Sequence, residues 1–117
     1  MEFKDVMENM KKENGEIPRP IELLGQLDES LVLNHAGDKQ FVFTKSALPQ
    51  KVKALIAVAV GIALDSPACI LNNVKGAKKA GATTEEIMEA FAIAKFSKGA
   101  SAISSSLPAM EWLVSNK

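Results

Sequence analysis

The chain has 117 residues, 14 lysines and arginines balanced by 14 aspartates and glutamates, one histidine and one cysteine. This length suits one domain with a buried core, and the zero net charge argues against nucleic acid or an anionic membrane as partner. A lone cysteine excludes an internal disulfide, and the longest uncharged apolar run, residues 54–64, is too short for a membrane span of about 20 residues. The charged N-terminus lacks a signal-peptide pattern, so we expect a cytoplasmic protein.

The first part of the chain, residues 1–47, is expected to contribute N-terminal helices. Helical spacing of apolar residues predicts a helix over 2–14 that stops at Gly15. A second set of apolar residues at helical spacing covers 21–32 and does not continue through 34–38, which predicts a break or turn at 35–37. Residues 39–47 are interpreted as a short helix or an irregular connection.

From residue 48 onward the pattern is clearer. Residues 50–64 are apolar on nearly all sides and predict a central core helix. Ser66 and Pro67 predict the start of the next helix, with Gly81 as its stop. Thr83 and Glu86 have the spacing of a capping box, which predicts another amphipathic helix.

A run of small residues follows Lys98, with Gly99, Ala100 and several serines among them. Small side chains let two backbones approach closely, so we interpret the run as packing against a neighbouring helix or subunit. A flexible serine-rich linker is the alternative. Because strands have almost no support, the chain is predicted to be all-α.

Cys69 is the best candidate for chemistry, because it stands third after the expected cap Ser66, beside the free amides of a first helical turn. A free thiol of pKa about 8.5 is roughly 3% ionised at pH 7, and a helix terminus contributes only about 0.3 to 1 kcal/mol. The nearby Asp65 carboxylate would disfavour the Cys69 thiolate. The same helix contains no histidine that could act as a base. A buried, inert cysteine is the alternative interpretation.

The remaining candidates are weaker. Asn73 lies one turn after Cys69 and can hydrogen-bond a sulfur or a water, but an amide cannot act as a general base; a solvent-facing asparagine is the alternative. His35 in the expected turn is interpreted as a surface or capping residue. No metal-ligand spacing is present, and neither a metal nor a cofactor is expected.

Residues 48–94, LPQKVKALIAVAVGIALDSPACILNNVKGAKKAGATTEEIMEAFAIA, resemble the carboxymuconolactone decarboxylase superfamily, which includes the alkylhydroperoxidase D (AhpD) proteins. The resemblance implies an all-α, AhpD-like domain around an antiparallel helix pair. Residues 48–117 would form the core, to which residues 1–47 belong as extra helices. It also implies a homo-oligomer, a trimer or hexamer.

The peroxidase branch of the family carries Cys-x-x-Cys-x-x-x-His, which lies on residues 66–73 without a gap. The resemblance places Cys69 at the cysteine that attacks peroxide, Ser66 at the resolving cysteine and Asn73 at the relay histidine. Ala54 falls at the relay glutamate. Three of the four chemical positions are therefore replaced.

Three hypotheses follow. The first is a peroxiredoxin-type thiol antioxidant or redox-responsive protein that uses Cys69 alone, with an external thiol reductant. The second is a non-catalytic helical oligomer with a degenerate active site. The third is a decarboxylase acting on a carboxylated lactone, which Asn73 disfavours because that branch keeps a histidine there.

Overall fold

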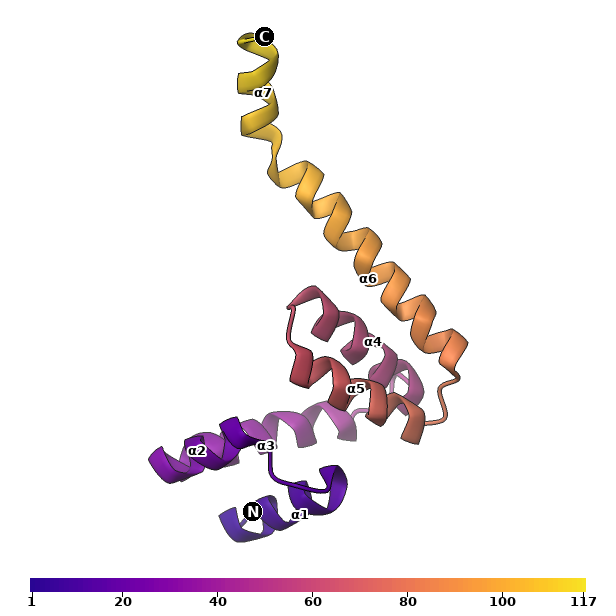
Figure 1. Cartoon of the computed structure of the whole chain (residues 1–117). Helices are drawn as coiled ribbons and strands as arrows, with labels where there is room; N and C mark the ends of the chain where they lie inside the picture. The colour runs from indigo at the N-terminus through magenta and orange to yellow at the C-terminus, as the bar shows by residue number, and fades with distance from the viewer. The chain divides into compact units, whose positions relative to one another are not determined.

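The computed structural model describes all residues, 1–117, and consists of seven α-helices without strands. The all-α prediction is confirmed. The chain divides into two compact units, residues 1–48 and 49–117. Figure 1 shows the helices of each unit.

The first unit contains α1 (Phe3–Asn14), α2 (Arg19–Leu27) and α3 (Glu29–Thr44). As predicted, α1 ends at Gly15, which adopts a φ of 82° and donates its N–H to the Lys11 carbonyl. Both α1 and α2 pack on α3. Gly25 of α2 lies so close to Phe3 that a Cβ would come within 2.8 Å of the ring, so the absence of a side chain lets α1 and α2 approach.

The predicted break at 35–37 is wrong. Of residues 39–47, interpreted as a short helix or an irregular connection, 39–44 are the last part of α3 and only 45–47 are irregular. The helical stripe is instead interrupted at Asp28, whose carboxylate accepts a 2.9 Å hydrogen bond from the Ser30 N–H and caps α3. The helix then runs through Gly37 to Thr44. Gly37 raises the free energy of this helix by only about 1 kcal/mol relative to alanine, which is too little to end it.

The second unit is built on α4 (Gln50–Ala63), α5 (Pro67–Lys79) and α6 (Thr84–Ser105). The helices α4 and α5 form the antiparallel pair, and α6 packs mainly on α4 (Figure 1). These helices and the turn before α6 supply one cluster of buried apolar side chains: Ala54, Val58, Ile62, Ala77, Ala82, Ile87, Ala90 and Ala94. The predicted central position of residues 50–64 is confirmed.

The start of α6 is the predicted capping box. The Thr83 hydroxyl accepts a 3.1 Å hydrogen bond from the Glu86 N–H, and the Glu86 carboxylate accepts a 2.9 Å bond from the Thr83 N–H. Lys51 of α4 reaches the same carboxylate at 2.9 Å. These contacts fix the first turn of α6 against α4.

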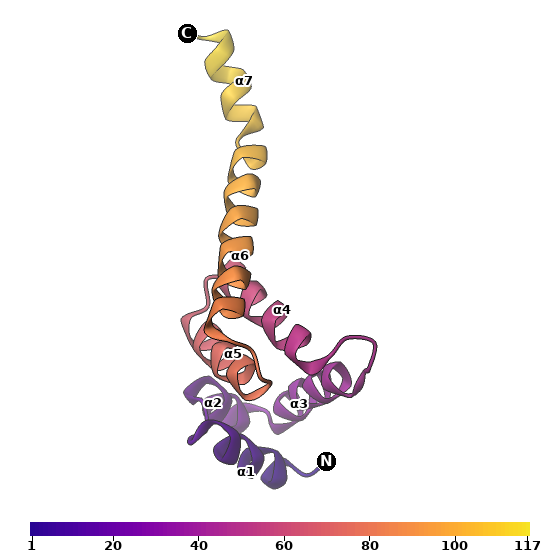
Figure 2. The ribbon, with the colours of Figure 1, turned by 90° about the vertical axis from the view of Figure 1, so that its right-hand side faces the viewer.

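The small-residue run belongs to the second half of α6, so the alternative of a flexible linker is wrong. Figure 2 shows α6 continuing past the ends of α4 and α5, with α7 (Leu107–Ser115) following it. Every residue from Gly99 to the C-terminus is exposed.

Candidate functional site

Cys69 lies in the first turn of α5, which begins at Pro67 and has Ser66 as its N-cap residue. Proline suits this first position because its missing N–H has no helical partner there. The Cys69 side chain is exposed, so the alternative of a buried thiol is wrong. The fold therefore presents an accessible sulfur beside a helix N-terminus.

Ser66 occupies the expected cap position, but its hydroxyl makes no capping hydrogen bond. The chain enters α5 through Asp65, which has a left-handed φ of 53°. The Ser66 N–H donates to the Gly61 carbonyl, and the Ile70 N–H donates to the Ser66 carbonyl. Backbone contacts thus hold this turn, and the prediction that the Ser66 side chain caps the helix is wrong.

Asn73 is half-buried and joins the two central helices. Its side-chain amide donates a 2.9 Å hydrogen bond to the Ala57 carbonyl in the middle of α4. The interpretation of Asn73 as a solvent-facing residue is therefore wrong. The side-chain nitrogen of Asn73 is thus used in a structural hydrogen bond between α4 and α5. An amide in this position does not take up or release a proton, so Asn73 cannot act as an acid–base relay.

Gly61 explains how α5 comes so near α4. A Cβ at this position would lie 3.3 Å from the Asn73 amide nitrogen and 3.5 Å from the Ile70 backbone nitrogen. The sequence interpretation did not single out Gly61. A lone glycine inside an otherwise apolar helix is the signal that could have identified this close approach.

Ala54 is buried in the core, with 7% of its surface exposed. A carboxylate there would lie among apolar side chains and lose its hydration, which raises the pKa of such a group. The position that the resemblance assigns to a relay glutamate is thus filled by packing. Among Ala54, Ser66 and Asn73, no side chain is a base for the Cys69 thiol.

The side chain of Lys98, which the sequence interpretation did not single out, forms an ion pair just before the N-cap of α5. Lys98 of α6 makes a 2.7 Å salt bridge with the Asp65 carboxylate and a 3.4 Å contact with the Ile62 carbonyl at the end of α4. Asp65 therefore does not act on the first turn of α5 as an isolated negative charge. The two partners are 33 positions apart in the sequence, which explains why local spacing alone did not reveal the pair.

His35 is exposed in the interior of α3, in the first unit. Its interpretation as a surface residue is confirmed, but it caps nothing. The chain contains no group of three or more histidine, cysteine, aspartate or glutamate side chains placed to hold a metal ion. None of the helices is both long enough and apolar enough to cross a membrane.

Two features define the class of protein. The core is built on the antiparallel helices α4 and α5, and a thiol lies at the N-terminus of α5. The sequence model of the carboxymuconolactone decarboxylase family matches residues 32–112, and the chain belongs to this family. The chain is also similar to "Uncharacterized protein 4 in cox locus" of Paracoccus denitrificans, with 51% identity over 53 residues. The match covers 45% of this chain and 48% of that relative, so the chain spans about half the length of the curated relative.

Proposed function

We propose that this family member is a single-cysteine, peroxiredoxin-type thiol protein in which the Cys69 sulfur reduces peroxides and an external thiol restores it. The observation that carries the proposal is the exposure of Cys69 in the first turn of α5. Free amides at a helix N-terminus favour an anionic sulfur. The sulfur is also open to a peroxide and to a second thiol.

The reaction is balanced as follows. The Cys69 thiolate attacks one peroxide oxygen, the O–O bond breaks, and the leaving alkoxide or hydroxide takes up a proton. The sulfur becomes a sulfenic acid. A reductant thiol then condenses with it and releases water, and a second reductant thiol breaks the mixed disulfide and returns Cys69 to the thiol.

The residues around Cys69 determine the expected rate at which peroxide oxidises its thiol. Asn73 is bonded to Ala57 and Ala54 is apolar, so the proton of the thiol leaves to water rather than to a side chain. General-base assistance is typically worth about 10²- to 10⁴-fold in rate. We therefore expect slow, near-stoichiometric oxidation, as suits a redox-responsive protein better than a fast peroxidase.

Mass spectrometry after brief peroxide treatment tests the proposal, with dimedone added to trap the sulfenic acid. One dimedone adduct at Cys69 is expected, with none in Cys69→Ser. A protein that stays folded and gains no adduct or mixed disulfide at Cys69 would refute the proposal.

A second variant tests the position of the sulfur. Ser66→Cys places a thiol three residues before Cys69, at the cap of the same helix. Peroxide should then give an intramolecular disulfide with loss of two hydrogens, in place of the dimedone adduct. Ser101→Cys, far along α6, is the matched control and should leave the Cys69 adduct unchanged.

A non-catalytic helical protein is the second candidate, and the use of Ala54 and Asn73 in packing favours it. The two candidates differ in turnover. Peroxide consumption that continues with dithiothreitol and stops in Cys69→Ser supports the thiol function, whereas equal background rates in both proteins support the second candidate. Decarboxylation of a carboxylated lactone, the third hypothesis, would appear as carbon dioxide release that does not depend on Cys69.

A further inference from the structure

We propose that Asn14 is a site of spontaneous covalent modification, at which the chain cyclises and loses ammonia, and that this modification loosens the end of α1. The products are an aspartate and an isoaspartate at position 14, and water is the only other reactant. The inference concerns the N-terminal unit and does not depend on the chemistry of Cys69.

The sequence around Asn14 favours this reaction over the same reaction at the other asparagines. The chain contains six asparagines: Asn9, Asn14, Asn34, Asn72, Asn73 and Asn116. Asn14 alone is followed by a glycine, Gly15. In the reaction, the backbone nitrogen of the following residue must reach the side-chain carbonyl carbon of the asparagine. A glycine offers no Cβ in the way and adopts backbone angles that other residues avoid.

The reaction proceeds in two balanced steps. The Gly15 backbone nitrogen attacks the side-chain carbonyl carbon of Asn14, and a new C–N bond closes a five-membered imide. The bond to the side-chain nitrogen breaks, and this nitrogen leaves as ammonia with the proton of the Gly15 N–H. Water then opens the imide at one of its two carbonyl groups, which gives either aspartate or isoaspartate.

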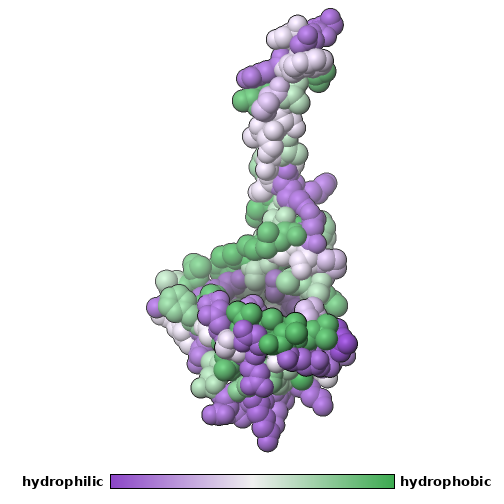
Figure 3. Space-filling model, turned by 90° about the vertical axis from the view of Figure 1, so that its left-hand side faces the viewer, coloured by the Kyte–Doolittle hydropathy of each residue, from purple (hydrophilic) through white to green (hydrophobic).

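The end of α1 leaves room for this cyclisation. Asn14 is the last residue of α1, and its side chain is exposed. Gly15 has a φ of 82°, and a Cβ there would meet no atom within 4 Å. Figure 3 shows the largely hydrophilic surface of the N-terminal helices at the lower end of the picture. Both the turning of the Asn14 side chain and the approach of water are therefore unobstructed.

One hydrogen bond opposes the attack. The Gly15 N–H donates to the Lys11 carbonyl at 2.9 Å, and the nitrogen must leave this partner before it can reach the Asn14 side chain. Local opening at the end of a helix has a free energy close to zero. The cap therefore slows the reaction at Asn14 without preventing it.

Four of the other asparagines lie inside helices, where cyclisation would require a much larger opening. Asn9 belongs to α1, Asn34 to α3, and Asn72 and Asn73 to α5. The backbone nitrogen that follows each of them is part of the regular helix. Opening the interior of a packed helix takes far more free energy than fraying its last residue.

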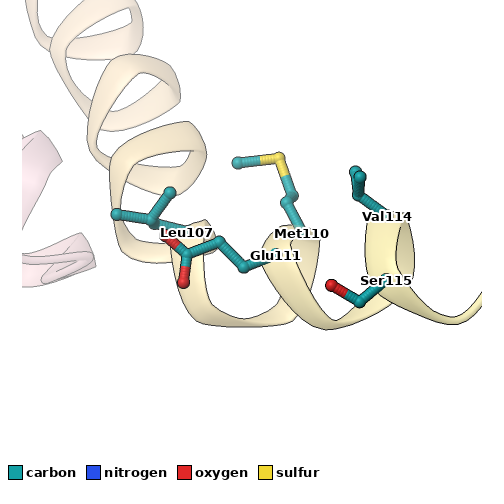
Figure 4. A pocket seen from close by; sticks show the side chains of 5 residues that line it. All are labelled: Leu107, Met110, Glu111, Val114 and Ser115. Carbon is teal, nitrogen blue, oxygen red and sulfur yellow. The ribbon is translucent and has the colours of Figure 1, made fainter.

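Asn116 is the nearest comparison, because it also lies at the end of a helix. It directly follows Ser115, which Figure 4 shows in the last turn of α7. The Asn116 side-chain amide donates a 2.8 Å hydrogen bond to the Trp112 carbonyl. The residue after it, Lys117, places a Cβ beside the attacking nitrogen. We therefore expect Asn116 to react more slowly than Asn14.

Both products should weaken the last turn of α1. A carboxylate at position 14 stands at the helix C-terminus, where the helix dipole disfavours negative charge. Isoaspartate also lengthens the backbone by one carbon atom and so displaces the Gly15 N–H from the Lys11 carbonyl. The same turn carries Glu13, which forms a 2.9 Å salt bridge with Lys39 of α3. The modification thus acts on the end of α1 that is paired with α3.

Peptide mass spectrometry of the full chain, incubated at pH 8, tests the site. Asn14 should be the first asparagine to become an acid, and both products should form, with isoaspartate identified by methylation with an isoaspartyl methyltransferase. Asn14→Gln is the matched control, because its longer side chain would have to close a six-membered ring, and it should stay unmodified. Earlier reaction at another asparagine, or aspartate without isoaspartate, would overturn the proposal.

Limited digestion with trypsin tests the loosening of α1. Lys11 and Lys12 are exposed in its last turn, and cleavage there reports how often the turn opens. The incubated protein should be cut at these lysines several-fold faster than fresh protein, whereas incubated Asn14→Gln should match its fresh form. Cleavage at Lys75, exposed on α5, should not change. Equal rates at Lys11 and Lys12 before and after modification would overturn the effect on α1.

Discussion

The side-chain amide of Asn73 on α5 donates a 2.9 Å hydrogen bond to the Ala57 carbonyl in the middle of α4. This carbonyl lies where Gly61 lets the two helices approach, and the Asn73 nitrogen is the nearest atom to the space a Gly61 side chain would fill. Asn73, which the resemblance places at the relay histidine, thus connects the central helix pair through a side-chain to backbone hydrogen bond.

Removal of this amide should weaken the helix pair. Asn73→Ala is expected to lower the free energy of unfolding by about 1 to 2 kcal/mol, through the lost hydrogen bond and lost packing. Urea denaturation measures the change. Asn72→Ala, at the exposed neighbouring position, is the control and should stay within about 0.5 kcal/mol of the parent protein. Equal losses in the two variants would contradict a structural role for the Asn73 amide.

Gly61 and Asn73 should be energetically coupled. An alanine inside a helix is favoured over glycine by up to about 1 kcal/mol, and Gly76→Ala on α5 should show this gain because its Cβ would meet open space. Gly61→Ala should gain less, because the new methyl group lies 3.3 Å from the Asn73 nitrogen. In the Asn73→Ala background the gain at Gly61 should increase, and a double-mutant cycle measures the difference. An additive cycle would show that the two side chains do not share this space.

Much of this architecture is predictable from local pattern. The capping box at Thr83 and Glu86 and the proline at the first position of α5 are short-range signals that the structure reproduces. The break at Asp28 was missed because the apolar stripe of residues 21–32 continues across it, although aspartate is itself a capping residue. Local spacing cannot reveal that Asn73 bonds Ala57 or that Lys98 reaches Asp65, since each contact depends on how α4, α5 and α6 pack.

Glu86 should make stability depend on pH. The hydrogen bond from the Thr83 N–H, followed by the contact with Lys51, lowers the pKa of Glu86 below its ordinary value of 4.5. The unfolded chain therefore takes up a proton at this residue first as the pH falls. The stabilisation from Glu86 is complete above about pH 4.5 and is lost as the pH drops through the lower folded value.

Urea midpoints measured between pH 6 and pH 3 test this contribution of Glu86. Glu86→Gln should flatten the acid limb of the stability curve most, and Lys51→Met should flatten it partly, because the Thr83 hydrogen bond remains. A curve for Glu86→Gln that matches the parent protein would contradict the assignment.

The pairing of Lys98 with Asp65 should influence the reactivity of Cys69. Asp65 stands just before the N-cap of α5, so an unpaired carboxylate there would disfavour the anionic sulfur. Lys98→Met leaves Asp65 without this cation and should slow the alkylation of Cys69 by iodoacetamide at pH 7.5. The effect should be modest, about two- to threefold, because Asp65 is 81% exposed and such pairs are weak in water.

Two further measurements separate the charge effect on Cys69 from a change in structure. Asp65→Asn added to Lys98→Met should restore the parent rate of alkylation, because no charge is then left unpaired. High salt should reduce the difference between Lys98→Met and the parent protein, since exposed charges are screened within about 3 Å at 1 M ionic strength. A slower rate that persists in both experiments would mean that Lys98 acts on the shape of the turn rather than on the charge beside Cys69.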